Sequence, residues 1–210
     1  MTSSPLLQLC GLSFERDDRL LFSDLSTTVE AGDILQVSGD NGSGKTTLLK
    51  VLIGSLSAHS GECRWRGTPV QKCAYEYASE LLYIGHQTGI KSTLTPEENL
   101  RWLDRLQGGS KPLESLTDTL ARVGLQGYED VPCHSLSAGQ QRRVALARLY
   151  ISQAALWVLD EPFTAIDRTG VAALEQQLQH HVKKGGAVVL TTHQPLAIDG
   201  VKSLRMGSQS

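Results

Sequence analysis

A run of glycine, lysine and threonine between residues 39 and 46 carries the clearest chemical signal in the sequence. It reads GDNGSGKT, and glycines permit the tight turns of positive φ that aim successive backbone N–H groups inward. Such a loop can wrap phosphate oxygens, while the lysine reaches the β and γ phosphates and the first threonine holds Mg²⁺. The acidic side chain at position 40 has to point away from a triphosphate. The residues predicted to bind the nucleotide are Gly39, Asp40, Asn41, Gly42, Ser43, Gly44, Lys45, Thr46 and Thr47.

Two adjacent carboxylates at the end of an apolar run supply the second part of such a site. Residues 156–159 read LWVL and are followed by Asp160 and Glu161. This pattern predicts a buried strand, and open α/β sheets place their ligands at the carboxyl ends of strands. We expect Asp160 to bind the metal through water and Glu161 to polarise the attacking water. An apolar strand that ends in Asp-Glu is by itself more often structural, and the phosphate loop is what favours catalysis here.

Strand and helix patterns alternate around these residues. The glycine-rich loop follows a predicted strand and leads into a stretch where leucines and an isoleucine recur at helical spacing. This context disfavours the alternative of an ordinary glycine-rich turn before a lysine. Alternation of strands with helices predicts an α/β fold with a partly parallel sheet. Strands are predicted at 6–10, 20–29, 33–38, 62–65, 81–85, 155–159 and 187–191, and helices at 45–54, 97–123, 141–149 and 169–183, with Gly124 as a helix stop.

Composition narrows the class of protein. The chain has 210 residues, of which 40% are hydrophobic, and this suits a single domain with one core. With 20 basic and 22 acidic residues the net charge is −2, so the strong positive field that nucleic-acid binding needs is absent. No apolar run approaches the ~18 residues that span a bilayer, and any membrane path has to come from another polypeptide.

Neither the four cysteines nor residues 5–10 form a recognised functional motif. Cys10, Cys63, Cys73 and Cys133 form no CxxC pair, and we expect them to be reduced thiols. Residues 5–10, PLLQLC, faintly resemble a lipoprotein cleavage site. No basic residue precedes them and the apolar run is short, so a first strand is the preferred interpretation.

The segment at residues 136–140, LSAGQ, lies just ahead of the helix predicted at 141–149. It resembles the LSGGQ signature of ATP-binding cassette (ABC) ATPases, with alanine in place of the first glycine, and residues 141–148 continue the resemblance. Alone, a Ser-Ala-Gly run would be interpreted as an ordinary helix start. Other motifs of the family follow in order. Gln87 matches the Q-loop glutamine, residues 164–167 occupy the place of the D-loop, and His193 matches the switch histidine that contacts the γ-phosphate.

This resemblance implies a P-loop NTPase fold of the ABC nucleotide-binding type, with an antiparallel β subdomain, a RecA-like core and a helical insertion. Residues 1–210 would form one such domain, with its helical subdomain at about 88–152. In this family the signature of one copy covers the γ-phosphate held by a second copy. The resemblance assigns nucleotide contacts in trans to Ser137, Gly139 and Gln140, catalysis to Glu161, His193 and Gln87, and Mg²⁺ binding to Thr46, Gln87 and Asp160.

One position departs from the family pattern. Many ABC ATPases stack an aromatic residue near the N-terminus on adenine, and this chain has Arg16 in that place, with Phe14 two positions earlier. A guanidinium can stack on a base, although an arginine in a charged turn is by default only solvated. Contact with adenine, and with it a strict preference for ATP over GTP, therefore stays open between Arg16 and Phe14.

Longer phrases narrow the resemblance further. Residues 85–91, 136–143, 159–167 and 191–195 read GHQTGIK, LSAGQQRR, LDEPFTAID and TTHQP. They are similar to the ATP-binding subunit of the bacterial cytochrome c maturation system, a haem exporter. This implies ATP hydrolysis that energises haem export or release of a haem-loaded chaperone, integral membrane subunits as partners, and a peripheral location on the cytoplasmic face of the inner membrane.

Two alternatives stay open beside that interpretation. A different ABC importer or exporter would differ mainly around Gln87 and in the helical insertion. A soluble ABC ATPase of DNA repair or translation would usually carry coiled-coil arms or a second cassette. Direct haem binding is not expected, because the sequence has no CxxCH, and His86, His180, His181 and Cys133 are interpreted as solvated histidines and a buried thiol.

Overall fold

The computed structural model describes residues 4–17, 19–106, 109 and 112–207. By its internal contacts the chain divides into two units, which we describe separately. The first unit comprises Met1–Tyr83, Ala154–Glu161 and Leu178–Ser210, and the second comprises Ile84–Gln153 and Pro162–Gln177.

A parallel sheet forms the centre of the first unit. Its strand order is β6-β7-β8-β3-β9, and β3 pairs in parallel with both β8 and β9. Every residue of β7 and β8 is buried, as expected for parallel strands that are covered on both faces. The strands are β3 (Ile34–Ser38), β6 (Leu81–Ile84), β7 (Leu156–Asp160), β8 (Ala187–Thr191) and β9 (Lys202–Arg205).

A second, antiparallel sheet in the same unit has the order β2-β1-β4-β5. β1 and β2 form a long hairpin that ends in the pair Arg16 and Arg19, so the predicted first strand continues well past residue 10. Its register shifts near Gly11, which has φ of 60° and donates its N–H to Ser26 Oγ at 2.9 Å. The strands are β1 (Leu7–Arg16), β2 (Arg19–Val29), β4 (Ser60–Trp65) and β5 (Thr68–Pro69).

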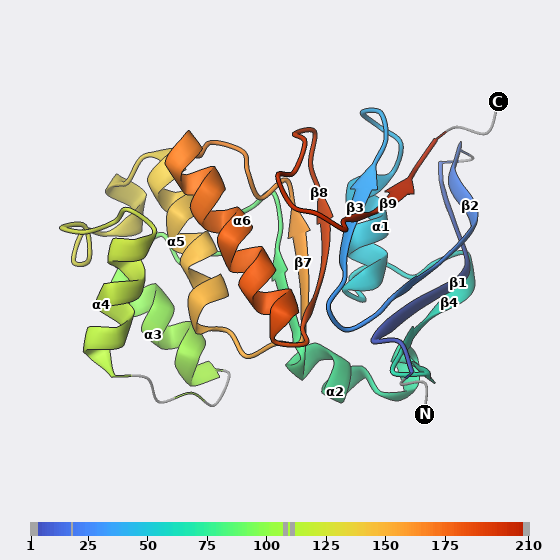
Figure 1. Cartoon of the computed structure of the whole chain (residues 1–210), viewed down its shortest axis with the longest axis horizontal. Helices are drawn as coiled ribbons and strands as arrows, with labels where there is room; N and C mark the ends of the chain where they lie inside the picture. Colours follow the sequence, from blue (N-terminus) through green and yellow to red (C-terminus); the bar gives the residue numbers. More distant parts are fainter. Residues whose placement is uncertain (1–3, 18, 107–108, 110–111, 208–210) are drawn as a thin grey trace. The chain divides into compact units, whose positions relative to one another are not determined.

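Helix α1 (Lys45–Leu52) lies between the parallel strands and the antiparallel sheet in Figure 1. Its apolar side chains join one buried cluster with residues of both sheets, and Leu48, Leu49 and Leu52 are fully buried. Removing this apolar surface from water stabilises the layered arrangement. The same unit also contains a short 3₁₀ turn (Val70–Lys72) and α2 (Ala74–Ser79).

The second unit is helical. Helices α3, α4 and α5 contact one another and share a buried cluster that includes Leu100, Leu120 and Val144. Cys133 is fully buried in this cluster, as predicted. The helices are α3 (Pro96–Leu106), α4 (Leu113–Arg122), α5 (Ala138–Ile151) and α6 (Arg168–Lys183), whose last residues belong to the first unit, with a 3₁₀ turn at Cys133–Ser135.

Several predicted elements need correction. The single helix expected at 97–123 is two helices, because Pro112, which precedes α4, has φ of −59° and ψ of 153° and cannot continue a helix. The stop at Gly124 is confirmed, with φ of 74° just after α4. Strand β9 and helix α2 were not predicted. Among the residues that the structure describes, no helix is long and apolar enough to span a membrane.

Candidate functional site

The predicted phosphate loop lies between the end of β3 and the start of α1. Gly39, Gly42 and Gly44 all have positive φ, at 148°, 81° and 92°. A Cβ on Gly39 would collide with the backbone carbonyl of Met206, because Met206 N–H bonds to Ser38 O at 2.7 Å beside the loop. The loop therefore needs glycine there both for conformation and for space. It presents the free N–H groups at the start of α1, an arrangement that attracts anions.

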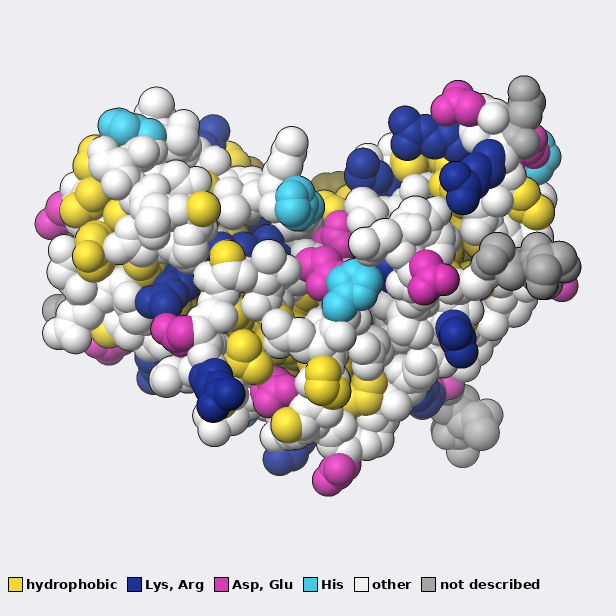
Figure 2. Space-filling view, turned by 90° about the horizontal axis from the view of Figure 1, so that it is seen from above, with side chains coloured by type: hydrophobic (Ala, Val, Ile, Leu, Met, Phe, Trp, Pro, Cys, Tyr) yellow, Lys and Arg dark blue, Asp and Glu magenta, His cyan; other side chains and the backbone are white. Residues whose placement is uncertain are grey.

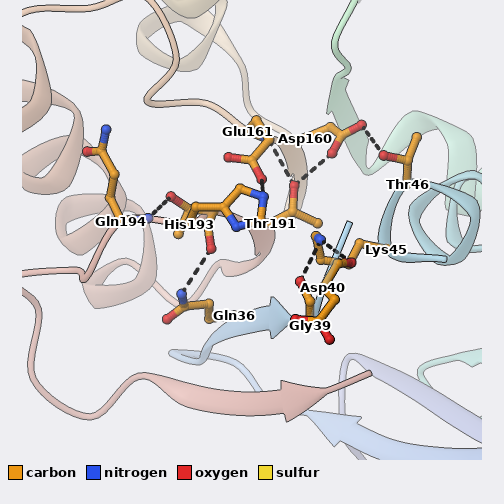
Figure 3. A network of polar contacts seen from close by, with 11 residues as sticks. Gln36, Gly39, Asp40, Lys45, Thr46, Asp160, Glu161, Thr191, His193 and Gln194 are labelled. Atoms are coloured by element: carbon orange, nitrogen blue, oxygen red, sulfur yellow. Dashed lines mark hydrogen bonds and ion pairs between the residues drawn. The ribbon is translucent and has the colours of Figure 1, made fainter. Parts of the chain in front are cut away.

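Lys45, the first residue of α1, is buried and folds over this loop. Its Nζ donates to the carbonyl oxygens of Gly39 at 2.7 Å and Asp40 at 3.0 Å (Figure 3). The residue Asp40 is exposed at the surface, as a carboxylate beside a phosphate site has to be. The ammonium group is thus held at the loop, where it can turn from backbone carbonyls to phosphate oxygens.

The predicted carboxylates meet the loop at the end of β7. Thr46 Oγ1 donates to Asp160 Oδ2 at 3.0 Å, so the hydroxyl and the carboxylate predicted to hold the metal are in contact. Asp160 is almost fully buried at 3% exposure. Its other oxygen, Oδ1, accepts a 2.7 Å hydrogen bond from Thr191 Oγ1. The carboxylate is therefore fixed in orientation from both sides.

Glu161 and His193 complete the group that Figure 3 shows together. Glu161 has φ of 49°, an uncommon value for a non-glycine residue, and its N–H donates to Thr191 Oγ1 at 2.9 Å. His193 Nε2 lies 3.4 Å from Glu161 Oε1. The turn before His193 is held by Gln36 Nε2, which donates to Thr192 O at 3.4 Å. The carboxylate of Glu161 and the imidazole of His193 thus face each other beside the carboxylate of Asp160.

These groups line one hollow of about 560 Å³ within the first unit. Asp160, Glu161 and His193 line it beside the loop, and Figure 2 shows acidic side chains and a histidine together on the surface. The tip of the β1–β2 hairpin contributes Arg16, Asp17, Arg19 and Leu21. From the phosphate loop the hollow is lined by Asn41, Gly42, Gly44, Lys45, Thr46 and Thr47.

The signature residues lie in the second unit, at the start of α5. Ser137 is the N-cap of this helix and forms a capping box with Gln140, with Gln140 N–H bonded to Ser137 Oγ at 3.3 Å and Ser137 N–H to Gln140 Oε1 at 2.9 Å. Gly139 lies against the D-loop, where a Cβ would be 3.2 Å from Ala165 O. Ser137 remains exposed at a helix N-terminus, which suits contact with an anion.

Gln87 follows β6 and is exposed in the second unit. The segment that leads to it is anchored by Arg142 of α5, whose Nη1 donates to Gly85 O at 2.6 Å. Arg142 is a buried residue, with 6% exposure. One further contact joins α5 to the D-loop. Arg143 Nη2 lies 2.8 Å from Asp167 Oδ2, and the N–H of Gly170, which bonds to Asp167, keeps the pKa of that carboxyl below its usual value.

The sequence did not single out Thr191 or Arg142 for a role. Thr191 stands at the end of an apolar strand, and only the pairing of β7 with β8 places it opposite Asp160. Arg142 follows the signature directly, but no sequence feature indicates that its partner is a backbone carbonyl at residue 85. His181, interpreted as solvated, is instead half-buried and stacked on Trp157 with ring centroids 3.7 Å apart.

Comparison with known proteins defines the class. A family model described as ABC transporter matches residues 22–164. Two solved structures share the fold: an ATP-binding subunit of an ABC transporter, with a TM-score of 0.82, 25% identity and coverage of 90% of this chain and 79% of that one, and an ABC transporter ATP-binding protein of Pyrococcus furiosus, with a TM-score of 0.82, 26% identity and coverage of 95% and 96%. The fold and the order of site residues are thus those of an ABC-type ATPase.

More similar relatives narrow the group. The cytochrome c biogenesis ATP-binding export protein CcmA of Pseudomonas fluorescens (strain Pf0-1) is 54% identical over 93% of this chain and 92% of its own length. The protein of the same name from Hahella chejuensis (strain KCTC 2396) is 51% identical over 99% of this chain and 98% of its own. The chain belongs to the ABC transporter family, in the group of cytochrome c biogenesis ATP-binding export proteins.

Proposed function

We propose that this chain binds Mg²⁺-ATP in the hollow of the first unit and hydrolyses it with Glu161 as the group that orients the attacking water. The contact between Thr46 Oγ1 and Asp160 Oδ2, at 3.0 Å, carries the proposal. It joins the phosphate loop to the carboxylates, so nucleotide and acid–base groups share one hollow. An ATPase needs this proximity because phosphoryl transfer depends chiefly on positioning and on charge stabilisation.

The residues at this contact fit Mg²⁺. The ion prefers oxygen ligands and is usually held by one or two protein groups together with substrate phosphates. Thr46 and Asp160 offer such oxygens, and the described part of the chain has no cluster of three or more His, Cys, Asp or Glu that would make a protein-only metal site. Bound there, the ion would neutralise charge on the β and γ phosphates. We propose Gln87 as a further ligand of the same ion.

The remaining residues take complementary roles in this proposal. Lys45 transfers its ammonium from the carbonyls of Gly39 and Asp40 to the β and γ phosphates. Glu161, held by its N–H on Thr191, aligns the water opposite the leaving phosphate. His193, 3.4 Å from Glu161, binds the γ-phosphate and keeps the carboxylate oriented. Each role uses a side chain that already lines the hollow.

A second copy of the chain completes the site in our proposal. Ser137 is exposed and Gly139 is half-buried at the N-terminus of α5, where the positive end of the helix dipole favours an anion. We expect them to cover the γ-phosphate held by the partner copy. Glu161→Gln should therefore form an ATP-dependent dimer in size-exclusion chromatography with light scattering, and the double variant Glu161→Gln/Ser137→Arg should stay monomeric. A dimer that persists in the double variant would contradict the trans assignment.

We further propose that the chain acts at the cytoplasmic face of a bacterial inner membrane, bound to integral membrane subunits of the cytochrome c system. ATP turnover there would drive haem export or release of a haem-loaded chaperone. The support is the group of relatives described above, together with an exposed Gln87 segment that can face a partner. The tagged chain, purified from membranes, should co-isolate multi-span subunits of that system. Recovery of an unrelated transporter alone would overturn the assignment.

A further inference from the structure

The hollow has two ends that differ in chemistry. The phosphate loop lines one end, and the tip of the β1–β2 hairpin, with Arg16 and Arg19, lines the other, which we call the base end. β2 lies directly against the phosphate loop, since a Cβ on Gly44 would be 3.3 Å from Leu21 Cβ. From Leu21 the strand runs to Arg19, and Arg16 pairs with Arg19 across the hairpin tip. A nucleotide whose phosphates lie on the loop therefore has the hairpin tip available for its base and ribose.

The described residues that line this end include no aromatic ring. Phe14, the aromatic candidate from the sequence, stacks on Phe22 with ring centroids 6.0 Å apart. Phe22 is 7% exposed, and both rings belong to the apolar core beneath the hairpin. Neither phenylalanine lines the hollow, whereas Arg16 and Arg19 do. The structure thus favours Arg16 over Phe14 as the residue that meets the base.

The guanidinium of Arg16 is available for such a contact. Its side chain is 73% exposed, and its Nε lies 3.7 Å from Asp17 Oδ2, an exposed ion pair of the kind that contributes little. Arg19 is exposed on the neighbouring strand. Figure 2 shows dark blue Lys and Arg side chains gathered with a magenta acidic one on the right of the face seen from above.

A guanidinium recognises a base differently from an aromatic ring. It can stack on the face of any base, and its edge offers only N–H donors. Guanine presents two adjacent acceptors, O6 and N7, that match this fork, whereas adenine presents one acceptor beside an amino donor. A base site built from arginines therefore has no means of preferring adenine.

On the proposed function as an ATPase, we infer that this chain takes purine nucleoside triphosphates as a class, with GTP bound about as tightly as ATP. Arg16 and Arg19 contact the base and ribose, and the affinity comes mainly from the triphosphate. The base end thus sets a permissive specificity, while the loop and the carboxylates set the chemistry.

The test is competition binding to the purified chain with Mg²⁺, in which unlabelled ATP and GTP displace a fluorescent ATP analogue. We expect the two Kd values to agree within about threefold. The double variant Arg16→Ala/Arg19→Ala should weaken both nucleotides about tenfold, and Arg16→Tyr should shift the ratio toward ATP. Arg64→Ala, which removes a half-exposed arginine outside the hollow, should leave both Kd values unchanged.

The outcomes separate this inference from the proposed function. If ATP binds more than tenfold tighter than GTP, or if the double variant binds both nucleotides as well as the parent, the inference is overturned while the ATPase proposal stands. If the parent chain binds neither nucleotide, both fail. If Lys45→Ala binds neither ATP nor GTP, the assay measures binding in this hollow. If that variant still binds them, the inference is overturned as well.

Discussion

Thr191 Oγ1 donates a 2.7 Å hydrogen bond to Oδ1 of Asp160, and the same oxygen accepts the N–H of Glu161 at 2.9 Å. One buried hydroxyl at the end of β8 thus holds the carboxylate of Asp160 and the backbone of Glu161 at the end of β7. The contact exists because β7 and β8 pair in parallel with Asp160 opposite Thr191. The register of two apolar strands therefore sets the geometry of the candidate catalytic group.

Replacing Thr191 with valine keeps the shape and removes the hydroxyl. Asp160 Oδ1 then loses a buried donor and the Glu161 N–H its acceptor, which costs on the order of 1–3 kcal/mol of unfolding free energy. We expect Thr191→Val to lose most ATP turnover with little change in ATP affinity. Thr191→Ser, which keeps the hydroxyl, should retain both. Equal stability and turnover of the two variants, by urea denaturation and phosphate release, would show that the hydroxyl has no positioning role.

Thr46 tests the metal contact separately from the phosphate loop. Thr46→Val removes the oxygen that meets Asp160 and should weaken Mg²⁺-dependent turnover roughly 10–100-fold, as the loss of metal-site contacts does elsewhere. Thr46→Ser should behave like the parent chain. The measurement is turnover as a function of Mg²⁺ concentration, and an unchanged Mg²⁺ requirement in Thr46→Val would contradict the assignment.

Arg142 tests the link between the signature helix and the Gln87 segment. Its guanidinium donates to Gly85 O at 2.6 Å from a buried position. Arg142→Met keeps much of the packing and leaves that carbonyl without this donor, so turnover should fall while nucleotide affinity holds. Arg142→Lys can still reach a carbonyl and should recover part of the rate. Normal turnover in Arg142→Met would show that this hydrogen bond is not needed for ATP hydrolysis.

His181 gives the chain a stability that depends on pH. Burial against Trp157 lowers the pKa of His181 from its ordinary 6.5 to about 4. Between pH 6.5 and pH 4 the His181 imidazole is protonated in the unfolded chain but neutral in the folded chain. The free energy of unfolding therefore decreases as the pH falls from 6.5 toward 4. The loss should approach about 2 kcal/mol by pH 4.5, after allowance for partial exposure.

The control for this effect is a non-titrating ring. His181→Phe can keep the stack on Trp157 and should lose less stability between pH 7 and pH 4.5 than the parent in denaturant titrations. His180→Phe, at the exposed neighbouring position, should follow the parent. Parallel curves for the parent and His181→Phe would remove His181 as the source of the pH dependence.

The phosphate loop, the carboxylates and the strand–helix alternation could be predicted because each is local. Gly39 to Thr46 follow the pattern of a phosphate loop, and the apolar strand before Asp160 is continuous. The structure brings Thr46, Asp160, Glu161 and His193 into one hollow. The roles of these residues remain proposals, as does the single domain with a helical subdomain at 88–152.

Features that depend on distant pairing could not be predicted. Strand β9 is short and mostly exposed, with an alternation too polar to stand out, and it forms only because β3 offers a neighbouring edge. The roles of Thr191 and Arg142 depend on which backbone or side-chain groups the fold brings opposite them. His181 looked like a surface histidine because the ring that covers it, Trp157, is distant in sequence.

The role of Glu161 is tested by steady-state ATP hydrolysis of Glu161→Gln beside the parent chain, with ATP binding measured on the same samples. The substitution keeps the size of the side chain and removes its ability to act as a base. We predict that ATP binding stays within about threefold of the parent while turnover falls at least 100-fold, in the range that a general base contributes. Turnover equal to that of the parent would show that Glu161 does not act as the catalytic base.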